Sequence, residues 1–373
     1  MKEYGAGLIG TGFMGKCHAM AWGAVKAVFG DVPRPRLEIL CDVDERSARA
    51  RAGEFGFARW TTDWREVMAD EAVDVVSITT PNALHRPMVE EAARNGKAIW
   101  CEKPLALTLE DATAMARAVS EAGVPALIGY NYLRNPAILH ARKLIAEGVI
   151  GEIIQFRGFC DEDYMADPDL PYTWRCRIGD AGTGALGDLS VHLISIARFL
   201  AGEIQEVMGD IRTVHEMRPD AENPGHQGRV ENDDQANALL RFSSGAQGIL
   251  MSSRVAWGRK NHLGFEVHGS RGMITFDQER MNELRLYRNA GAKDTQGFVT
   301  ILSGPAHPPY GAFTPAPGHG LGFNDLKVIE AAHLLRALEG REKLYPDMED
   351  ALKIERVIHA IVTSSHEKTW LSV

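Results

Sequence analysis

The stretch Cys101-Glu102-Lys103-Pro104-Leu105 places a charged pair directly after the apolar run Ala98-Ile99-Trp100. Proline has no backbone N–H, so a strand over residues 97–101 is expected to end abruptly here. In open α/β sheets, ligands bind at the carboxyl ends of the strands. A lysine at that edge can hydrogen-bond a substrate oxygen and stabilise the negative charge that develops on it. The alternative interpretation of Lys103 is a surface lysine beside a turn.

Asp188 and His192 form a second candidate pair, four residues apart near the middle of the chain. If this stretch is helical, both side chains lie on one face, with Cβ atoms roughly 5–6 Å apart. Histidine titrates near neutral pH and can accept a hydroxyl proton, and a neighbouring carboxylate orients the ring and supports its charged form. The spacing alone equally fits an N-capping aspartate followed by a core histidine. A metal site is not expected, because no third ligand lies nearby in the sequence.

A glycine-rich pattern near the N-terminus predicts a nucleotide site. The sequence Gly10-Thr11-Gly12-Phe13-Met14-Gly15 fits G-x-G-x-x-G and lies between an expected strand, Tyr4–Ile9, and an expected helix, Phe13–Phe29. The first glycine permits a tight turn, the second lets a pyrophosphate approach the backbone, and the third lets helix and strand pack closely. Free N–H groups at the helix N-terminus attract the phosphates. Unless the motif is a turn without a ligand, the residues that hold the cofactor here are Gly10, Gly12, Phe13, Met14 and Gly15.

Asp42 follows the next expected strand, Leu37–Cys41, and bears on the choice of cofactor. An acidic side chain at this position accepts hydrogen bonds from an adenosine ribose and repels a 2′-phosphate. No arginine follows Asp42 directly, so NAD is favoured over NADP. The alternative is that Asp42 or Asp44 caps the following helix. Both roles can hold, because they can fall to different residues.

The segment after the expected strand Val73–Ile78 carries three further polar residues of interest. Thr80 and Asn82 are placed to hydrogen-bond the cofactor, although Asn82 could equally be a helix N-cap. His85 falls in the first turn of the following helix, near the same edge. The predicted cofactor-binding set therefore also includes Thr80, Asn82, His85, Glu102 and Lys103.

The pattern of expected elements changes after about residue 150. Residues 1–130 alternate apolar strands with amphipathic helices, which predicts a parallel sheet covered on both faces, a Rossmann-like α/β domain that binds NAD(P). Beyond about residue 150, strands recur without intervening helices, and turn sequences such as Ser243-Ser244-Gly245 predict hairpins. Residues 131–373 are therefore expected to form an α+β domain with a largely antiparallel sheet.

Composition excludes several classes of protein. The formal net charge of −9 disfavours sequence-independent nucleic-acid binding and docking on anionic membranes. No apolar run approaches the ~20 residues of a membrane span, and the first residues lack the pattern of a secretory signal. The five cysteines form no C-x-x-C pair, so disulfide scaffolding and zinc binding are poor interpretations. These features predict a cytoplasmic protein.

Four motifs occur in a fixed order: G-x-G-x-x-G at Gly10–Gly15, T-P-N-x-x-H at Thr80–His85, E-K-P at Glu102–Pro104 and D-x-x-x-H at Asp188–His192. Their combination resembles the family of glucose–fructose oxidoreductase and inositol dehydrogenase, often called Gfo/Idh/MocA. The resemblance spans essentially the whole chain, and the combination is specific although each motif alone is not. It implies a Rossmann domain that binds NAD(P) and an α+β domain whose open antiparallel sheet covers the nicotinamide.

The resemblance also implies roles for the chemical residues. Lys103, Asp188 and His192 match the catalytic positions of the family. The implied reaction is oxidation of a secondary alcohol, in which His192 accepts the hydroxyl proton, Asp188 orients the ring and Lys103 hydrogen-bonds the reacting oxygen. The nicotinamide takes the hydride, and no metal is needed. A cis Lys103–Pro104 peptide bond and a homodimer or homotetramer are further implications. The resemblance also implies that the domain of residues 131–373 serves substrate binding and oligomerisation.

Residues expected around the substrate also lie outside the three catalytic positions. Asn131 and Tyr132 follow the expected strand Ala126–Tyr130, and Trp174 and Arg175 lie in the loop before the Asp188 stretch. Aromatic faces suit the C–H patches of a sugar, and a guanidinium offers fixed donors. Ordinary packing or surface ion pairing is the alternative for each. The substrate-binding set expected from the sequence is Lys103, Asn131, Tyr132, Trp174, Arg175, Asp188 and His192.

Three functions compete at this point. The first is an NAD-dependent dehydrogenase of a sugar, anhydrosugar or cyclitol such as an inositol. The second is an NAD-assisted glycosidase, which oxidises its substrate only transiently and consumes no cofactor. The third is a nucleotide-sensing regulator without turnover, and the presence of both Lys103 and His192 counts against it.

Overall fold

The computed structural model describes residues 3–221 and 223–373, which divide into two compact units. The first unit combines the chain up to Arg134 with the segment Gly322–Lys353, and the second combines Asn135–Leu321 with Ile354–Val373. The sequence pattern places residues 322–353 in the predicted second domain. This segment instead packs in the first unit, because the inner face of its helix is apolar and contacts the first helix of the chain.

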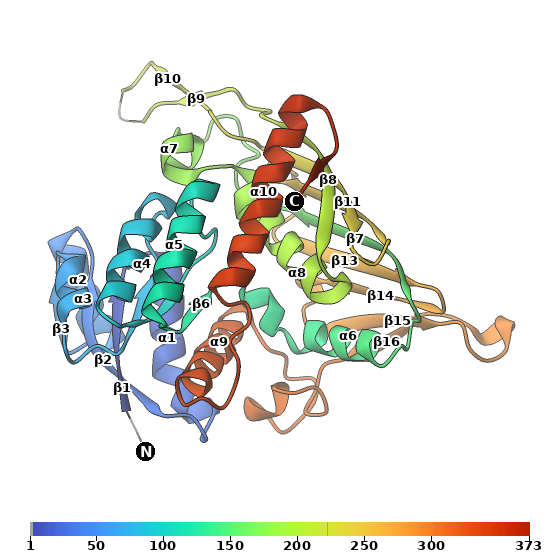
Figure 1. Cartoon of the computed structure of the whole chain (residues 1–373), viewed down its shortest axis with the longest axis horizontal. Helices are drawn as coiled ribbons and strands as arrows, with labels where there is room; N and C mark the ends of the chain where they lie inside the picture. Colours follow the sequence, from blue (N-terminus) through green and yellow to red (C-terminus); the bar gives the residue numbers. More distant parts are fainter. Residues whose placement is uncertain (1–2, 222) are drawn as a thin grey trace. The chain divides into compact units, whose positions relative to one another are not determined.

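The first unit is built on a six-stranded parallel sheet in the order β3-β2-β1-β4-β5-β6. Strands β1, β2, β3 and β6 of this sheet are labelled in Figure 1. Its strands are β1 (Glu3–Ile9), β2 (Arg34–Cys41), β3 (Arg59–Thr61), β4 (Val75–Ile78), β5 (Ala98–Cys101) and β6 (Ala126–Ile128). Its helices are α1 (Phe13–Val28), α2 (Glu45–Phe55), α3 (Trp64–Ala69), α4 (His85–Arg94), α5 (Leu109–Ala122) and α9 (Phe323–Leu338). The predicted parallel α/β sheet is confirmed. Strand β3 was missed because only Thr61 of its three residues is buried, which leaves no apolar run.

The strand order of this sheet reverses between β1 and β4. At such a reversal the two crossovers leave in opposite directions, and a crevice opens outside the carboxyl ends of the strands. Gly10 follows β1 and Thr79 follows β4, and Thr79 Oγ1 donates to the carbonyl oxygens of Ile9 and Gly10 (2.9 Å each). The topology thus brings the glycine motif and the T-P-N-x-x-H motif to one edge.

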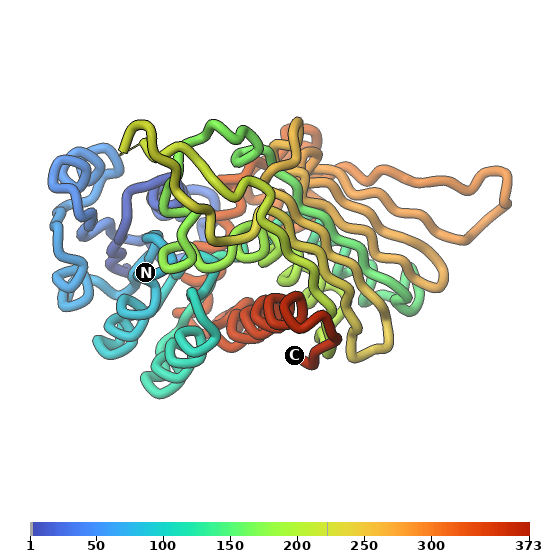
Figure 2. Tube along the Cα trace, turned by 90° about the horizontal axis from the view of Figure 1, so that it is seen from above, coloured from blue at the N-terminus to red at the C-terminus, as the bar shows by residue number. Residues whose placement is uncertain are grey.

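The second unit carries a nine-stranded sheet in the order β16-β15-β14-β13-β7-β12-β11-β8-β17, and Figure 2 shows these strands running side by side. All neighbouring pairs are antiparallel except β7 with β12, so the predicted mostly antiparallel sheet is confirmed. The strands are β7 (Ile153–Asp161), β8 (Ile204–Arg212), β11 (Gln235–Phe242), β12 (Gln247–Ser253), β13 (His262–Gly269), β14 (Gly272–Asp277), β15 (Glu283–Arg288), β16 (Val299–Leu302) and β17 (Leu371–Ser372). A separate hairpin pairs β9 (Met217–Pro219) with β10 (Gln227–Arg229).

Helices of the second unit pack on this sheet. Its helices are α6 (Pro136–Ala146), α7 (Ile178–Ala181), α8 (Val191–Ala201) and α10 (Met348–Glu367), the last of which begins in the first unit. α6 contacts β14 and β15, and α8 contacts β7 and β13. Towards the edge of the sheet, Ser364 and Ser365 of α10 accept hydrogen bonds from the backbone N–H groups of Gly209 and Ile211 in β8 (2.9 and 3.0 Å).

One helical stretch, Ile178–Ala201, is long and apolar enough to cross a membrane by length and composition. The sequence predicts no membrane span here, because Asp188 and His192 interrupt the apolar run. In the structure 89% of its most apolar window is buried inside the protein, as in the core helix of a globular domain.

Two buried histidines of the first unit are expected to make its stability depend on pH. Burial lowers the pKa of both His18 and His333 from 6.5 to about 4. Both rings are therefore neutral at pH 7, and the contact of His18 with Glu102 (Nε2–Oε1 2.8 Å) is a hydrogen bond rather than an ion pair. The unfolded chain protonates these histidines first, so stability is lost as the pH falls from about 6.5 toward 4.

Each of these histidines is expected to cost about 2 kcal/mol of unfolding free energy between pH 7 and pH 5. Denaturant titrations at the two pH values measure the loss. His333→Gln should remove its own share, about 2 kcal/mol, because the amide does not titrate. The exposed His226 provides the control, since His226→Gln should keep the full pH dependence. An unchanged pH dependence in His333→Gln would contradict the assignment.

Candidate active site

The glycine motif at the end of β1 has the geometry of a phosphate cradle. Gly10 has φ +93°, a conformation that glycine adopts without strain, and a Cβ on Gly15 would lie 2.1 Å from the carbonyl oxygen of Gly10. A Cβ on Gly12 would meet nothing within 4 Å, so space is open beside that residue. Gly12 is also the N-cap of α1, whose first N–H groups receive no side-chain cap. Open space and uncapped donors fit the pyrophosphate of a dinucleotide.

Asp42 links the end of β2 to the glycine motif. Its Oδ2 accepts a hydrogen bond from the backbone N–H of Thr11 (3.0 Å) and a second one from the Thr11 hydroxyl. Helix α2 is capped by Asp44, whose Oδ1 accepts from the N–H of Ser47 (2.8 Å). The capping role therefore falls to Asp44, and contact between Asp42 and a ribose stays a prediction.

The other cofactor residues of the first unit differ in exposure. Phe13 is 71% exposed and stacks on Phe323 of α9, with ring centroids 5.9 Å apart. Met14, Thr80 and Asn82 are partly buried. Asn82 begins a short 3₁₀ turn, Asn82–Leu84, whose N-cap is Pro81. The N-cap interpretation of Asn82 is therefore wrong, and its contact with a cofactor stays a prediction.

His85 was predicted to contact the cofactor, but the structure turns its side chain into the protein. The ring is fully buried. Nδ1 lies 3.0 and 3.2 Å from the carbonyl oxygens of Pro104 and Leu105, and Nε2 lies 3.1 Å from the carbonyl oxygen of Thr80. The ring thus joins the segments after β4 and β5, because backbone acceptors surround it where the sequence suggested an open edge.

Glu102 also differs from its prediction as a cofactor ligand. Its side chain is buried and accepts hydrogen bonds from His18 of α1 and from Lys327 of α9. Burial would raise the pKa of Glu102, but Lys327 and His18 hold that pKa well below its usual range. Lys327 was missed in the sequence because it lies more than 200 residues from Glu102, in the middle of an apolar helix.

Lys103 follows this buried carboxylate and is itself partly exposed. The Lys103–Pro104 peptide bond is cis, as the resemblance implied. Asn131 and Tyr132, predicted to bind substrate, are buried in the 3₁₀ turn Asn131–Arg134. The Tyr132 ring packs edge-on against Phe323 with centroids 6.0 Å apart. Packing accounts for this tyrosine, and substrate contact by either residue stays a prediction.

In the second unit, Asp188 and His192 lie on one helical stretch. A wide π-helical turn, Leu186–Ser190, leads directly into α8. Its start is fixed by Asp233, whose carboxylate accepts from the backbone N–H groups of Gly184 (2.7 Å) and Leu186 (2.8 Å). A Cβ on Gly184 would lie 1.8 Å from the Asp233 carbonyl oxygen, so this close approach requires glycine. The helix is therefore capped by Asp233, which leaves the Asp188 carboxylate for another role.

Tyr164 is a partner of Asp188 that the sequence analysis missed. Its hydroxyl donates to Asp188 Oδ2 (2.8 Å). Burial and the charge of Asp188 raise the pKa of Tyr164 well above its usual range, so the phenol stays protonated and keeps donating. Tyr164 lies between β7 and the stretch that carries Asp188, and no spacing in the sequence links it to Asp188.

A cavity of about 390 Å³ in the second unit is lined by Tyr164 and Asp188. Its wall combines acidic, hydroxyl and cationic side chains with a small apolar patch: Glu162, Tyr164, Thr173, Arg175 and Asp188, and Met165, Leu170 and Pro171. The predicted Arg175 is thus at the cavity, and its guanidinium lies 4.5 Å from the centre of the Trp174 ring. Such a wall can bind several hydroxyls and one apolar face of a small neutral molecule.

Tyr164→Phe is expected to lower kcat about 10-fold, because it removes a hydrogen bond to a charged acceptor worth about 1.5–3 kcal/mol. The Asp188 carboxylate would then be less firmly oriented. Steady-state rates of the variant measure the effect, and Tyr172→Phe, outside the cavity, is the matched control. A rate equal to the wild type would show that the Tyr164 bond has no part in turnover.

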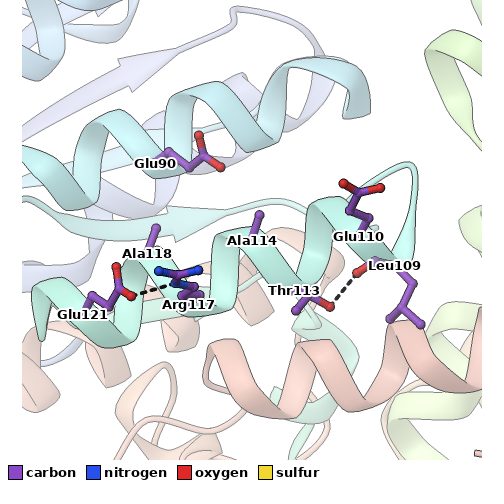
Figure 3. Close-up of a pocket in the computed structure, with 8 residues that line it drawn as sticks. All are labelled: Glu90, Leu109, Glu110, Thr113, Ala114, Arg117, Ala118 and Glu121. Atoms are coloured by element: carbon purple, nitrogen blue, oxygen red, sulfur yellow. Dashed lines mark hydrogen bonds and ion pairs between the residues drawn. The ribbon is translucent and has the colours of Figure 1, made fainter.

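A second hollow lies on the surface between α4 and α5 (Figure 3). Its lining residues are Glu90, Leu109, Glu110, Thr113, Ala114, Arg117, Ala118 and Glu121. Arg117 donates to Glu121 (Nε–Oε1 2.7 Å) and Thr113 to the Leu109 carbonyl (2.7 Å), so these polar groups bond along their own helix. None of the predicted site residues lines it. Within the described residues, no group of three or more His, Cys, Asp or Glu side chains is arranged to hold a metal ion.

Comparison with known proteins relates both units to one family. A family model described as an oxidoreductase family with an NAD-binding Rossmann fold matches residues 4–130. The model of the GFO/IDH/MocA C-terminal domain matches residues 138–275. The first unit therefore contains an NAD-binding Rossmann domain, and the cavity with Asp188 lies in the unit that carries the second match.

Individual relatives match over the full chain. Levoglucosan dehydrogenase from Pseudarthrobacter phenanthrenivorans is 38% identical, over 100% of this chain and 99% of the relative. Inositol 2-dehydrogenase from Rhizobium meliloti is 29% identical, over 98% of both chains. A solved structure of levoglucosan dehydrogenase in complex with NADH and levoglucosan matches with a TM-score of 0.97, at 38% identity and 100% coverage of both chains.

Proposed function

The chain belongs to the Gfo/Idh/MocA family of NAD-dependent oxidoreductases, and we propose that it oxidises a CH–OH group of a neutral sugar, anhydrosugar or cyclitol. The observation that carries this proposal is the whole-chain similarity to levoglucosan dehydrogenase, whose solved complexes hold NADH and levoglucosan. The cavity beside Asp188 supports it, because its wall offers hydrogen-bonding groups of several kinds and an apolar patch.

The proposed chemistry assigns one task to each of three residues. His192 accepts the hydroxyl proton of the substrate, which leaves the carbinol oxygen negatively charged as the reaction proceeds. Lys103 donates a hydrogen bond to that oxygen and stabilises its charge. Asp188, held by the Tyr164 hydroxyl, orients the imidazole and binds a neighbouring substrate hydroxyl. The glycine motif Gly10–Gly15 would hold NAD, which would supply the hydride acceptor, and the product would be a carbonyl compound.

The cavity wall also bears on which substrates are accepted. Glu162 and Asp188 bring two carboxylates and Arg175 one guanidinium, so the wall has no cationic excess. A sugar acid or sugar phosphate would face like charge there, at a cost in binding. Neutral polyols are therefore the proposed class, with an anhydrosugar favoured by the similarity to levoglucosan dehydrogenase.

An absorbance screen at 340 nm tests the function. Purified protein is mixed with NAD or NADP and with hexoses, anhydrosugars, inositols and sugar acids. Reduced cofactor with neutral polyols and NAD is the expected result. If no compound of the panel reduces the cofactor, in protein that binds NAD, the glycosidase or the regulator would be favoured. Turnover of aryl glycosides with retained NAD would then identify the glycosidase.

We further propose a cytoplasmic homodimer or homotetramer in which the nine-stranded sheet contributes to the subunit interface. The apolar side chains of Leu239 and Met251, on the neighbouring strands β11 and β12, are 44% and 48% exposed. Such side chains on an open sheet face favour burial against a second copy. Light scattering in solution measures the mass, and a monomer would contradict this proposal.

A further inference from the structure

A buried charge cluster holds the residue that precedes Lys103. The Glu102 carboxylate accepts from His18 (Nε2–Oε1 2.8 Å) and from the ammonium group of Lys327. Lys327 is fully buried and also donates to Glu330, one turn further along α9 (Nζ–Oε2 2.8 Å). Burial alone would lower the pKa of Lys327, but Glu102 and Glu330 outweigh it and raise that pKa. The ammonium therefore stays charged between two acids, and the chemistry proposed above uses none of these groups.

The Glu102 carboxylate is closely packed against neighbouring groups. A Cβ on Gly129 would lie 2.6 Å from Glu102 Oε1, so the carboxylate sits directly against the backbone after β6. The His18 ring stacks on Trp100 with centroids 3.7 Å apart, and the Trp100 side chain is fully buried. Close packing therefore restricts both the Glu102 carboxylate and the His18 ring to these positions.

A second buried group holds the residues that follow Lys103. His85 is fully buried, with Nδ1 3.0 Å from the carbonyl oxygen of Pro104 and 3.2 Å from that of Leu105. Its Nε2 is 3.1 Å from the carbonyl oxygen of Thr80. Burial lowers the pKa of His85, so the neutral ring carries a single N–H. The two carbonyl oxygens at Nδ1 favour the tautomer with the proton on Nδ1, which donates to Pro104 and Leu105 after β5.

We propose that Lys327 and His85 are positioning residues for Lys103, which they hold from its two sides through Glu102 and through the Pro104 and Leu105 carbonyls. This inference rests on the proposed catalytic role of Lys103. A displacement of about 1 Å at a reacting group can cost about 10²-fold in rate, so anchoring both neighbours of a flexible lysine has a large effect on turnover.

A double-mutant cycle tests the inference. Lys327→Met is expected to lower kcat by about 10–10²-fold in the wild-type background, with the Kd for NAD within about threefold. In the Lys103→Ala background the same substitution should change kcat by less than about threefold, because the group that it positions is gone. Equal losses in the two backgrounds would overturn the inference, since a general structural defect acts without Lys103.

Lys97→Met is the matched control. Lys97 is also a buried lysine of the first unit, and its ammonium donates to the carbonyl oxygens of Asp70 (2.8 Å) and Val73 (2.7 Å). It precedes β5, whereas Lys103 follows the other end of that strand. Its replacement should lower the thermal midpoint and leave kcat unchanged. A loss of kcat equal to that of Lys327→Met would count against a specific role for Lys327.

Removing one partner of a buried ion pair is strongly destabilising. If Lys327→Met does not fold for this reason, substitutions of His85 provide the same test. His85→Leu should repeat the cycle result with Lys103→Ala, and His85→Asn, which keeps an N–H donor at the position of Nδ1, should recover at least part of the lost kcat. Equal kcat in the Leu and Asn variants would overturn the role of the bond to Pro104 and Leu105.

A readout without substrate separates this inference from the proposed function. Reductive ¹³C-methylation labels accessible lysines, and the NMR signal that disappears in Lys103→Ala belongs to Lys103. A shifted or broadened Lys103 signal in His85→Leu, but not in Lys97→Met, supports positioning even if no polyol is oxidised. An unchanged signal overturns positioning even if the wild type is an active dehydrogenase.

Discussion

Alanine at Lys103 or at His192 is expected to lower kcat by about 10²–10⁴-fold while NAD binding stays within about threefold of wild type. Lys103→Ala removes the donor to the reacting oxygen, and His192→Ala removes the proton acceptor. Turnover at 340 nm with a saturating polyol gives kcat, and calorimetry gives the Kd for NAD. The double variant should be hardly slower than either single one, because groups that serve one step are strongly non-additive.

Two controls accompany these variants. His268→Ala removes a histidine of the second unit that lies on β13 beside Glu266 (Nε2–Oε2 3.0 Å), outside the cavity wall. It should leave kcat and NAD binding unchanged. If His192→Ala instead lost NAD binding with its fold preserved, His192 would belong to the cofactor site and the proposed proton transfer would be wrong.

Valine at Gly12 is expected to weaken NAD binding at least about 10²-fold without lowering thermal stability. A Cβ at this position meets nothing within 4 Å, so the fold tolerates the side chain. The valine would fill the space beside the uncapped N-terminus of α1 and keep the pyrophosphate from hydrogen bonds worth about 1.5–3 kcal/mol each. Calorimetric titration with NAD and a thermal melt measure the two effects.

Two other glycines of α1 separate the possible causes. Gly23→Val adds the same side chain to the same helix, at an exposed position with nothing within 4 Å, and should leave NAD binding unchanged. Gly15→Val should prevent folding, because its Cβ would lie 2.1 Å from the Gly10 carbonyl oxygen. Wild-type affinity in Gly12→Val would show that the phosphates lie elsewhere.

Local pattern was sufficient for most of the fold and for the choice of motifs. Short apolar strands such as Val75–Ile78 alternate with amphipathic helices, and this alternation specifies a parallel α/β sheet without any long-range information. The same holds for Gly10–Gly15, because strand, glycine turn and helix are consecutive in the chain. The order of the motifs likewise identified the family, which the comparisons confirm.

Local pattern misassigned residues whose partners are distant in the sequence. Glu102 and His85 look like edge residues from their place after strands, yet the structure turns both inward. Their partners come from α9, α1 and neighbouring strand ends. Tyr164 had no visible role for the same reason, since its bond to Asp188 joins a loop to a helix.

The sequence by itself determined most of the elements, the parallel and antiparallel sheets and the type of cofactor, because these follow from short-range periodicity and from contiguous motifs. Only the tertiary structure decided that Lys327 joins Glu102, that Asp233 caps the helix of His192, and that residues 322–353 return to the first unit. A buried charge needs a charged or hydrogen-bonding partner, and that partner can come from any part of the chain that the fold places beside it. Composition and local spacing do not show which distant side chain this is.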